Sequence, residues 1–185
     1  MRFVLIDRIL EIEPGRSLTA VKNLSLAEEY LADHFPGFPV MPGVLMLEAL
    51  TQAGAWLIRV TDDFAHSVIV LKTAKTIKYG SFVEPGRQLQ LRVDLIEHGP
   101  RESQFKAKGI IEDQVMVQGR LTLTRYNLRE RDPGLYATDT KIVEGMRDLY
   151  GTLRKGSVGA RAMIRDGSTV VAPSAAELVA GRGNH

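Results

Sequence analysis

The sequence contains no cysteine, which excludes disulfides, thiolate metal ligands and thiol nucleophiles. It also has no excess of one charge: 24 basic and 22 acidic side chains give a net charge of +2, so it offers no basic arm for nucleic acid. The longest mainly apolar run, residues 44–58, is interrupted by polar side chains and is too short to cross a bilayer. Asp7 comes too early for the apolar core of a signal peptide. These absences predict a soluble protein without a membrane partner, and the lack of cysteine fits a cytoplasmic location.

Length and composition predict one domain followed by an extension. A chain of 185 residues with 44% hydrophobic and 25% charged side chains is an ordinary globular sequence of about one domain. The Pro133-Gly134 pair ends the last strand pattern, and seven of the 17 glycines fall between positions 145 and 183. We therefore place the domain at residues 1–128 and interpret residues 129–185 as a partly helical C-terminal extension, to which the pattern assigns no role.

Hydrophobic periodicity predicts one buried helix and a run of strands. Residues 44–60 are apolar on almost every helical face, so we expect this helix to be buried on all sides. A single helix followed by turn-connected strands indicates an α+β fold in which an antiparallel sheet covers the helix. The first of five predicted strands alternates weakly enough for a sheet edge. These strands span residues 17–23, 67–78, 88–97, 103–112 and 114–126.

Three shorter elements are predicted from capping and amphipathic patterns. Ser25 and Glu28 have the spacing of a capping box, which would open a helical turn at residues 29–31. Ser174 and Glu177 have the same spacing and predict a short final helix. Between these two, apolar residues at helical spacing predict an amphipathic helix that contains Ile142, Val143, Met146, Leu149, Tyr150 and Leu153.

Residues 34–44 combine proline and glycine at high density. Prolines at positions 36, 39 and 42 stiffen the segment and remove backbone donors. Pro42 suits the first position of the following helix, where a missing N–H costs nothing. Gly43 has no side chain, so a ligand can approach its N–H closely. A helix N-terminus carries unpaired N–H groups and a positive dipole end, so this point favours a developing negative charge on a carbonyl oxygen.

Two ionisable side chains flank that helix start. His34 opens the proline-rich segment, and Glu48 lies within the apolar helix, where burial would penalise its charged form. Thr51 and Gln52 follow three and four residues later on the same helical face and can supply hydrogen bonds to it. A histidine in a loop is usually solvated, whereas an acid in a helix without a polar face is less easily explained. His34, Gly43 and Glu48 together form a candidate acid–base site.

These residues resemble the 3-hydroxyacyl-[acyl-carrier-protein] dehydratases of bacterial fatty-acid synthesis, of the type that does not isomerise its product. That family's pattern is His-Phe-Pro-Gly-x-Pro-x-x-Pro-Gly-Val, followed by Glu-Ala and by a Gln three residues after the Ala. Residues 34–44, Glu48, Ala49 and Gln52 match every fixed position. Similar flanking segments extend the resemblance over roughly residues 3–126.

The resemblance implies a hot-dog fold, in which a long antiparallel sheet wraps one central helix, and a homodimer or a trimer of dimers with composite active sites. His34 of one subunit would then face Glu48 of the other. The implied reaction removes water from a 3-hydroxyacyl chain on acyl carrier protein to give the trans-2-enoyl thioester. His34 and Glu48 would be the catalytic acid–base pair, and the Gly43 N–H would bind the thioester oxygen. Gln52 and Thr51 would act behind them, and no metal or redox cofactor is implied.

Other functions stay open at this point. Residues 79–82 replace an aromatic-basic-basic-Pro sequence of the family and Arg87 replaces a frequent Asp, which leaves room for a dehydratase of a secondary lipid or polyketide pathway. A hot-dog thioesterase would need an activated water rather than a base over C2. A non-catalytic acyl-binding hot-dog module would be expected to lack His34 or Glu48, and both are present. A basic rim for an acidic carrier protein is a further hypothesis, with Arg101, Lys106, Lys108, Arg120 and Arg125 as its candidates.

Overall fold

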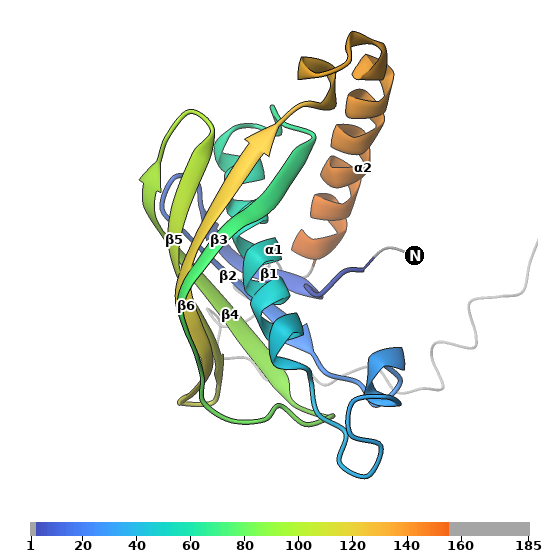
Figure 1. Ribbon diagram of the computed structural model, residues 1–185, viewed down its shortest axis with the longest axis vertical. Helices are drawn as coiled ribbons and strands as arrows, with labels where there is room; N and C mark the ends of the chain where they lie inside the picture. The colour runs from blue at the N-terminus through green and yellow to red at the C-terminus, as the bar shows by residue number, and fades with distance from the viewer. Residues whose placement is uncertain (1–2, 156–185) are drawn as a thin grey trace, which may run out of the picture.

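The structure is a computed structural model in which residues 3–155 are described, so the helix expected at Ser174 and Glu177 lies outside the described residues. Six antiparallel strands form one curved sheet in the spatial order β1-β2-β4-β5-β6-β3. Figure 1 shows this sheet along one side of the long helix α1 (Gly43–Thr61), which confirms the predicted α+β architecture. The strands are β1 (Arg8–Glu13), β2 (Ser17–Asn23), β3 (Val68–Tyr79), β4 (Gln88–His98), β5 (Glu102–Ile111) and β6 (Gln114–Tyr126).

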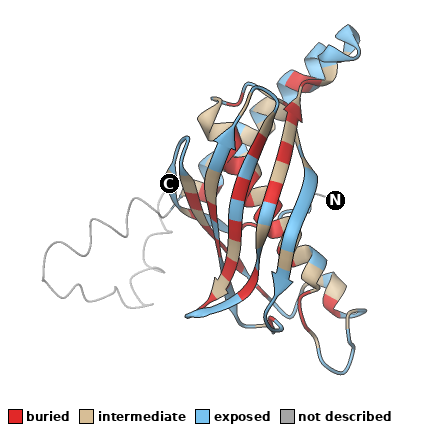
Figure 2. Cartoon of the chain, turned by 60° about the vertical axis from the view of Figure 1, so that its left-hand side comes forward, coloured by how far each residue is buried: buried red, intermediate tan, exposed pale blue. Residues whose placement is uncertain are grey.

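The core lies between α1 and the inner face of the sheet. Residues of the central strands alternate between buried and exposed (Figure 2), because successive side chains of a strand point to opposite faces. Gly54 of α1 lies against Leu123 and Phe105 of the sheet, and even a Cβ at this glycine would be in van der Waals contact with them. The helix therefore approaches the sheet closely, with a buried face that carries Met46, Ala49, Leu50, Ala53 and Leu57.

Helix α1 is not buried on all sides, contrary to the prediction. Val44 is 68% exposed, and Leu47, Glu48 and Gln52 are partly exposed. The sheet encloses only one side of the helix, so this stripe of apolar and polar side chains is incompletely covered within one chain. No helix in residues 3–155, α1 included, combines the length and the apolar character needed to cross a membrane.

The prediction that residues 17–23 form an edge strand is wrong. Strand β2 pairs with β1 on one side and with β4 on the other. The edges are β1, which is too short to give a clear periodic signal, and β3. The pairing of β3 is interrupted between Leu71 and Thr73 and between Lys75 and Lys78, and Thr76 in the second interruption has a positive φ of 53°.

The helical turn at Glu29–Leu31 forms, but the predicted capping box does not. The carboxylate of Glu28 instead binds the ammonium group of Lys22, which is buried beside it. Ser25 Oγ accepts a hydrogen bond only from the N–H of Ala27, at 3.2 Å. Leaving the buried ammonium group of Lys22 without a partner would cost more free energy than losing a helix cap, which is worth about 1 kcal/mol. Glu28 therefore pairs with Lys22 instead of capping the turn.

The amphipathic helix predicted in the extension is confirmed as α2 (Tyr136–Arg154). It stands on the side of α1 that faces away from the sheet (Figure 1). The ring of Tyr150 contacts the rings of Trp56 and Phe64, with centroids 6.1 Å and 5.7 Å apart. Aromatic packing therefore joins the extension to the central helix.

A buried carboxylate connects the start of α2 to the end of the sheet. Asp139 accepts hydrogen bonds from Ser67 Oγ and from the N–H groups of Leu128 and Arg129, the last two at 2.9 and 3.0 Å. Burial by itself raises the pKa of Asp139, but these hydrogen bonds and the charge of Arg129 outweigh it and hold the pKa below its usual value. The ionised carboxylate is thus the form that holds α2 in place.

Removing the ring of Phe105 tests whether the contact between α1 and the sheet holds the fold together. Phe105 is fully buried, so Phe105→Ala should lower the free energy of unfolding by about 3–5 kcal/mol through lost burial and a residual cavity. Leu26 is 70% exposed, and Leu26→Ala should change the same quantity by no more than about 0.5 kcal/mol. Urea unfolding of both variants measures the difference, and equal losses would contradict this description of the core.

Candidate active site

His34 is held in one orientation by its own loop. Its Nδ1 lies 3.0 Å from the carbonyl oxygen of Val40, and because a carbonyl only accepts, the neutral ring carries its hydrogen on Nδ1 and keeps a free lone pair on Nε2. The N–H of His34 donates to the carbonyl of Tyr30 at 3.1 Å, which fixes the backbone as well. Phe35 follows with a φ of 59°, a left-handed conformation that is costly for a bulky residue. The loop therefore presents a base beside a strained backbone.

The N-terminus of α1 has free donors. The helix begins at Gly43, and Pro42 occupies the N-cap rather than the first helical position that we predicted. Within residues 3–155, the N–H groups of Gly43 and Val44 have no hydrogen-bond partner. A Cβ at Gly43 would stand 3.0 Å from the ring of Tyr79, so this aromatic ring lies against the helix start. Two free N–H groups at the positive end of a helix can hold an anionic oxygen.

A cavity of about 330 Å³ joins these two features. His34 and Gly43 both line it, and most of the remaining wall is apolar. Sequence reasoning noted residues 79–82 only as a departure from a family pattern, although two aromatic residues around a Gly-Ser break after a long strand are a signal for a cavity wall. The rest of the lining is Met41, Met46, Tyr79, Gly80, Ser81 and Phe82.

Glu48 is part of a separate polar arrangement one turn into α1. Its Oε1 accepts a hydrogen bond from Gln52 Nε2 at 3.0 Å, as the i,i+4 spacing predicts. The same Gln52 binds the N-terminal segment, donating to the carbonyl of Phe3 at 3.1 Å and accepting from the N–H of Leu5 at 2.9 Å. The hydroxyl of Thr51 donates to the carbonyl of Leu47 in its own helix, at 3.1 Å, rather than to Glu48. The supporting role of Thr51 stays a prediction.

The structure does not bring His34 and Glu48 into one cavity of a single chain. Met46 lines the cavity of His34, whereas Glu48 does not. With about 100° per residue in an α-helix, two residues place Glu48 roughly 200° around α1 from Met46, on nearly the opposite side. Within one chain the two ionisable groups therefore face different directions.

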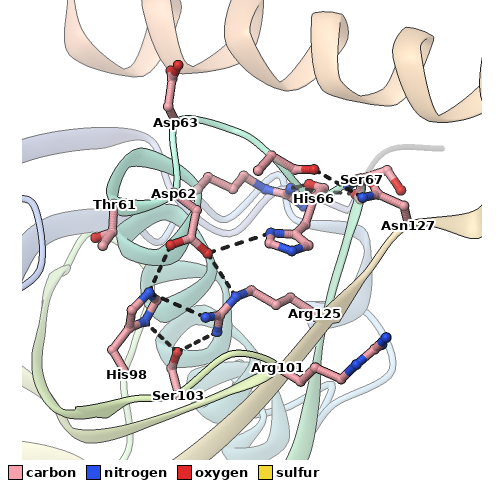
Figure 3. Close-up of polar contacts among 12 residues, drawn as sticks. Thr61, Asp62, Asp63, His66, Ser67, His98, Arg101, Ser103, Arg125 and Asn127 are labelled. Carbon is pink, nitrogen blue, oxygen red and sulfur yellow. Dashed lines mark hydrogen bonds and ion pairs between the residues drawn. The ribbon is translucent and has the colours of Figure 1, made fainter. Parts of the chain in front are cut away.

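A second cluster of charged and polar residues lies at the other end of α1 (Figure 3). His98 joins Asp62 to Ser103: its Nε2 lies 2.8 Å from Asp62 Oδ1 and its Nδ1 lies 2.8 Å from Ser103 Oγ. Arg125 crosses this set, with Nε 2.8 Å from Asp62 Oδ2 as an ion pair and Nη1 donating to Ser103 Oγ at 2.8 Å. His66 completes the cluster, with its Nδ1 3.6 Å from Asp62 Oδ2.

The order Ser103, His98 and Asp62 resembles the connectivity of a catalytic triad, but the environment excludes a nucleophile. Ser103 is fully buried, and its oxygen already accepts a hydrogen bond from the Arg125 guanidinium. The guanidinium of Arg125 therefore occupies space beside Ser103 Oγ that a substrate would need. No cluster in residues 3–155 has the three ligands that a metal ion needs. The cluster therefore connects the end of α1 to strands β4, β5 and β6 as a structural ion-pair network.

The basic rim predicted from the sequence is divided between several places. Arg125 is buried in the cluster just described, and Arg101 pairs with Glu130 at 2.8 Å. The other three candidates lie on the outer face of the sheet. Lys106 of β5 is opposite Arg120 of β6, and Lys108 lies two residues further along β5. The rim hypothesis is thus wrong for Arg125.

The part of the chain that matches a known protein family includes the candidate active site. A family model described as a FabA-like domain matches residues 1–122, which include the His34 loop, α1 and most of the sheet. The chain belongs to the FabA-like family. Helix α2 begins at Tyr136 and so lies beyond the part that matches this FabA-like model.

The matches between this FabA-like chain and its curated relatives cover most of each relative's length. A protein of Albidiferax ferrireducens named 3-hydroxyacyl-[acyl-carrier-protein] dehydratase FabZ is 42% identical over 124 residues, 65% of this chain and 82% of that protein. Proteins of the same name from Janthinobacterium and Symbiobacterium thermophilum are 36% and 35% identical, and the matches cover 85% and 92% of them and 70% and 71% of this chain.

Solved structures with low sequence identity share the fold. The dehydratase heterocomplex ApeI:P from Xenorhabdus doucetiae matches with a TM-score of 0.59 at 17% identity, over 72% of this chain and 90% of that chain. The smu.793 protein of Streptococcus mutans bound to acetyl CoA matches with a TM-score of 0.52 at 12% identity, over 69% and 94% of the two chains. The fold of this FabA-like chain is the hot-dog fold, as predicted.

The buried cluster should make stability depend on pH through His66. Its pKa is lowered from the usual 6.5, chiefly because burial disfavours the imidazolium; Arg125 and Arg101 lower it further, while Asp62 and Glu130 raise it. Below about pH 6.5 the unfolded chain binds a proton at this histidine that the folded chain does not, so the free energy of unfolding falls as the pH falls.

Replacing His66 with Gln removes that proton from both states. We expect the free energy of unfolding of His66→Gln to fall less steeply than that of the wild type between about pH 6.5 and 5. Urea unfolding at a series of pH values measures both slopes, and values at pH 8 provide the reference at which the wild-type histidine is neutral in both states. Parallel curves would show that His66 titrates alike in the folded and unfolded chain.

Proposed function

We propose that this chain removes water from 3-hydroxyacyl chains carried on acyl carrier protein, giving the trans-2-enoyl thioester in fatty-acid synthesis. The observation that carries the proposal is the imidazole of His34, which keeps a free Nε2 and lines the same cavity as the unpaired N–H of Gly43. A base and an oxyanion-binding donor in one cavity are what removal of a proton from C2 of a thioester requires. The names of the curated relatives supply the substrate class.

The chemistry is acid–base catalysis with charge stabilisation. The thioester oxygen binds the Gly43 N–H, and Nε2 of His34 takes the proton from C2. The electron pair of the C2–H bond forms the C2–C3 double bond as the C3–O bond breaks, and protonated Glu48 supplies the proton with which the hydroxyl leaves as water. His34 is then protonated and Glu48 ionised, and exchange with water returns both to their starting forms.

We propose that a dimer brings His34 and Glu48 into one site, because a single chain keeps them apart. In our proposal, His34 of one subunit and Glu48 of the other flank one acyl chain, and a larger assembly of such dimers keeps each site unchanged. Two observations support this: the two residues lie on different sides of α1, and the stripe of α1 around Glu48 is incompletely covered. An apolar side chain as exposed as Val44 in this stripe can be buried by contact with another chain.

The carrier protein docks, in our proposal, on the outer face of the sheet near β3. Arg120 of β6 lies between Lys106 of β5 and Lys75 of β3, although like charges placed opposite each other destabilise a sheet. Lys108 and Lys78 lie in the adjacent row, and none of these five cations forms an ion pair with any residue in the range 3–155. An acidic carrier would relieve this repulsion. Lys78 is also next to Tyr79 of the cavity wall, so a docked carrier would be near the site.

We retain the division after residue 128 as part of this proposal. The last strand ends at Tyr126 and the FabA-like match ends at residue 122, so the residues assigned to catalysis all precede the boundary. Helix α2 then belongs to an extension that the proposed reaction does not use.

Removing either ionisable group should abolish most of the turnover. We expect His34→Ala and Glu48→Gln each to lower kcat for a carrier-bound 3-hydroxyacyl substrate by a factor of about 10²–10⁴, because each removes one of two proton transfers. The assay follows enoyl thioester formation, with Thr51→Ala as the control, because the Thr51 hydroxyl only bonds its own helix. Wild-type turnover in both variants would overturn the catalytic assignment of His34 and Glu48. Equal turnover of 3-hydroxyacyl chains on free coenzyme A would overturn the assignment of acyl carrier protein as the carrier of the substrate.

Mixing the two inactive variants tests the composite site. In dimers formed at random from His34→Ala and Glu48→Gln chains, about half are mixed, and each mixed dimer holds one site with both groups intact. Activity should therefore return to about one quarter of the wild-type value after the subunits are unfolded and refolded together. A mixture that stays as inactive as its components would show that His34 and Glu48 act within one chain.

A further inference from the structure

A second cavity lies between the two helices, outside the candidate active site. Its volume is about 190 Å³, and one of its walls comes from α2, which the FabA-like match does not include. Gln52 lies at one end of the cavity along α1, and Arg59 lies at the other. The two residues are seven positions apart in the helix, which corresponds to roughly 10 Å along its axis. The walls between these ends are apolar, with Val4, Ala55, Trp56, Ile69, Met146 and Leu149.

Arg59 is a half-buried cation without a counter-charge. Its Nη1 donates to the carbonyls of His66 and Ser67, at 3.1 and 3.5 Å. No carboxylate in residues 3–155 forms an ion pair with it, and the nearby Asp62 is engaged by Arg125 and His98. Burial lowers the pKa of Arg59 to about 10, and no neighbouring acid offsets that loss. A desolvated guanidinium keeps donors in a planar fork that matches a carboxylate.

We propose that this cavity binds a medium-chain fatty acid, with the carboxylate on Arg59 and the alkyl chain between α1 and α2. The apolar walls fit an alkyl chain, and the single cation fits a single negative charge. A phosphate group typically meets several donors, and Arg59 is the only cation among the lining residues in the described part of the chain. The ligand class is therefore an amphipathic carboxylate with a chain of limited length.

The fatty-acid site goes beyond the proposed dehydration and is connected to it by one side chain. Gln52 lines this cavity and also donates to Glu48 at 3.0 Å. Phe3, whose carbonyl accepts from the same Gln52, forms another part of the cavity wall. Binding of a fatty acid is a property of Arg59 and α2, and it does not require turnover at His34.

Calorimetric titration of the full-length protein with octanoate tests the site, with octanol as the uncharged ligand of equal chain length. We expect octanoate to bind at least roughly ten-fold more tightly than octanol, and Arg59→Gln to abolish this preference. Met146→Trp, which fills the cavity and leaves Arg59 in place, should weaken both ligands at least roughly ten-fold. Lys141 is an exposed cation of α2 away from the cavity, and Lys141→Gln should bind octanoate like the wild type.

The controls separate this site from the proposed catalysis. His34→Ala should bind octanoate as the wild type does; loss of binding in that variant would place the carboxylate in the candidate active site and overturn the proposal. Equal octanoate affinity in the wild type and Arg59→Gln would also overturn it, and thermal melts establish that each variant is folded. Absence of octanoate binding to the wild type would overturn it as well.

Discussion

The packing of α1 against the curved sheet is the contact on which the other features depend. The helix packs against strands β2 to β6, and Gly54 lets it approach Phe105 closely. A helix held in this way cannot rotate or slide without breaking those contacts. Gly43, Glu48 and Arg59 therefore keep fixed positions along one rigid rod, and each faces a different environment. The same scaffold thus serves an anion-binding end, an acid and a cation.

The two ends of α1 are treated in opposite ways. At the C-terminal end, Asp62 is surrounded by Arg125, His98 and His66, so buried charges compensate one another. At the N-terminal end, Pro42 offers no side-chain cap and the first N–H groups are left free. Buried ion pairs are costly to break, whereas free donors are available to a ligand. The charges around Asp62 are therefore satisfied within the chain, whereas the first N–H groups of α1 and, one turn before Asp62, the guanidinium of Arg59 remain available to ligands.

Local patterns predicted those parts of the structure that depend on neighbours in the sequence. The long helix, the strands from residue 67 onward and α2 follow from periodicity, because each buries a regular face. The bond between Glu48 and Gln52 follows from helical spacing alone. The partner of the Thr51 hydroxyl was not predictable from that spacing, because the carbonyl of Leu47 in its own helix is an alternative acceptor that the pattern does not rank against Glu48.

Features that join distant segments were not predictable in this way. Arg125 seemed to be a surface cation on a strand, but its partner Asp62 is 63 positions away and no local signal connects them. The pairing of Lys22 with Glu28 overrode a capping pattern for a similar reason, since burial of the lysine depends on the whole sheet. The relation between His34 and Glu48 was named from a family resemblance, and a single chain leaves it incomplete. Burial and assembly, rather than propensity, decide these positions.

The irregular edge strand β3 affects how readily the chain aggregates through its sheet edge. An unpaired, regular strand edge can take up extended segments of other chains and so promotes aggregation. Strand β3 is broken in register at two points and carries Lys75 and Lys78 around the second one. A strand that pairs with this edge would lose hydrogen bonds at the interruptions and would have to bury part of the lysine charge. The irregularity and charge of β3 therefore protect this edge of the sheet from indiscriminate association.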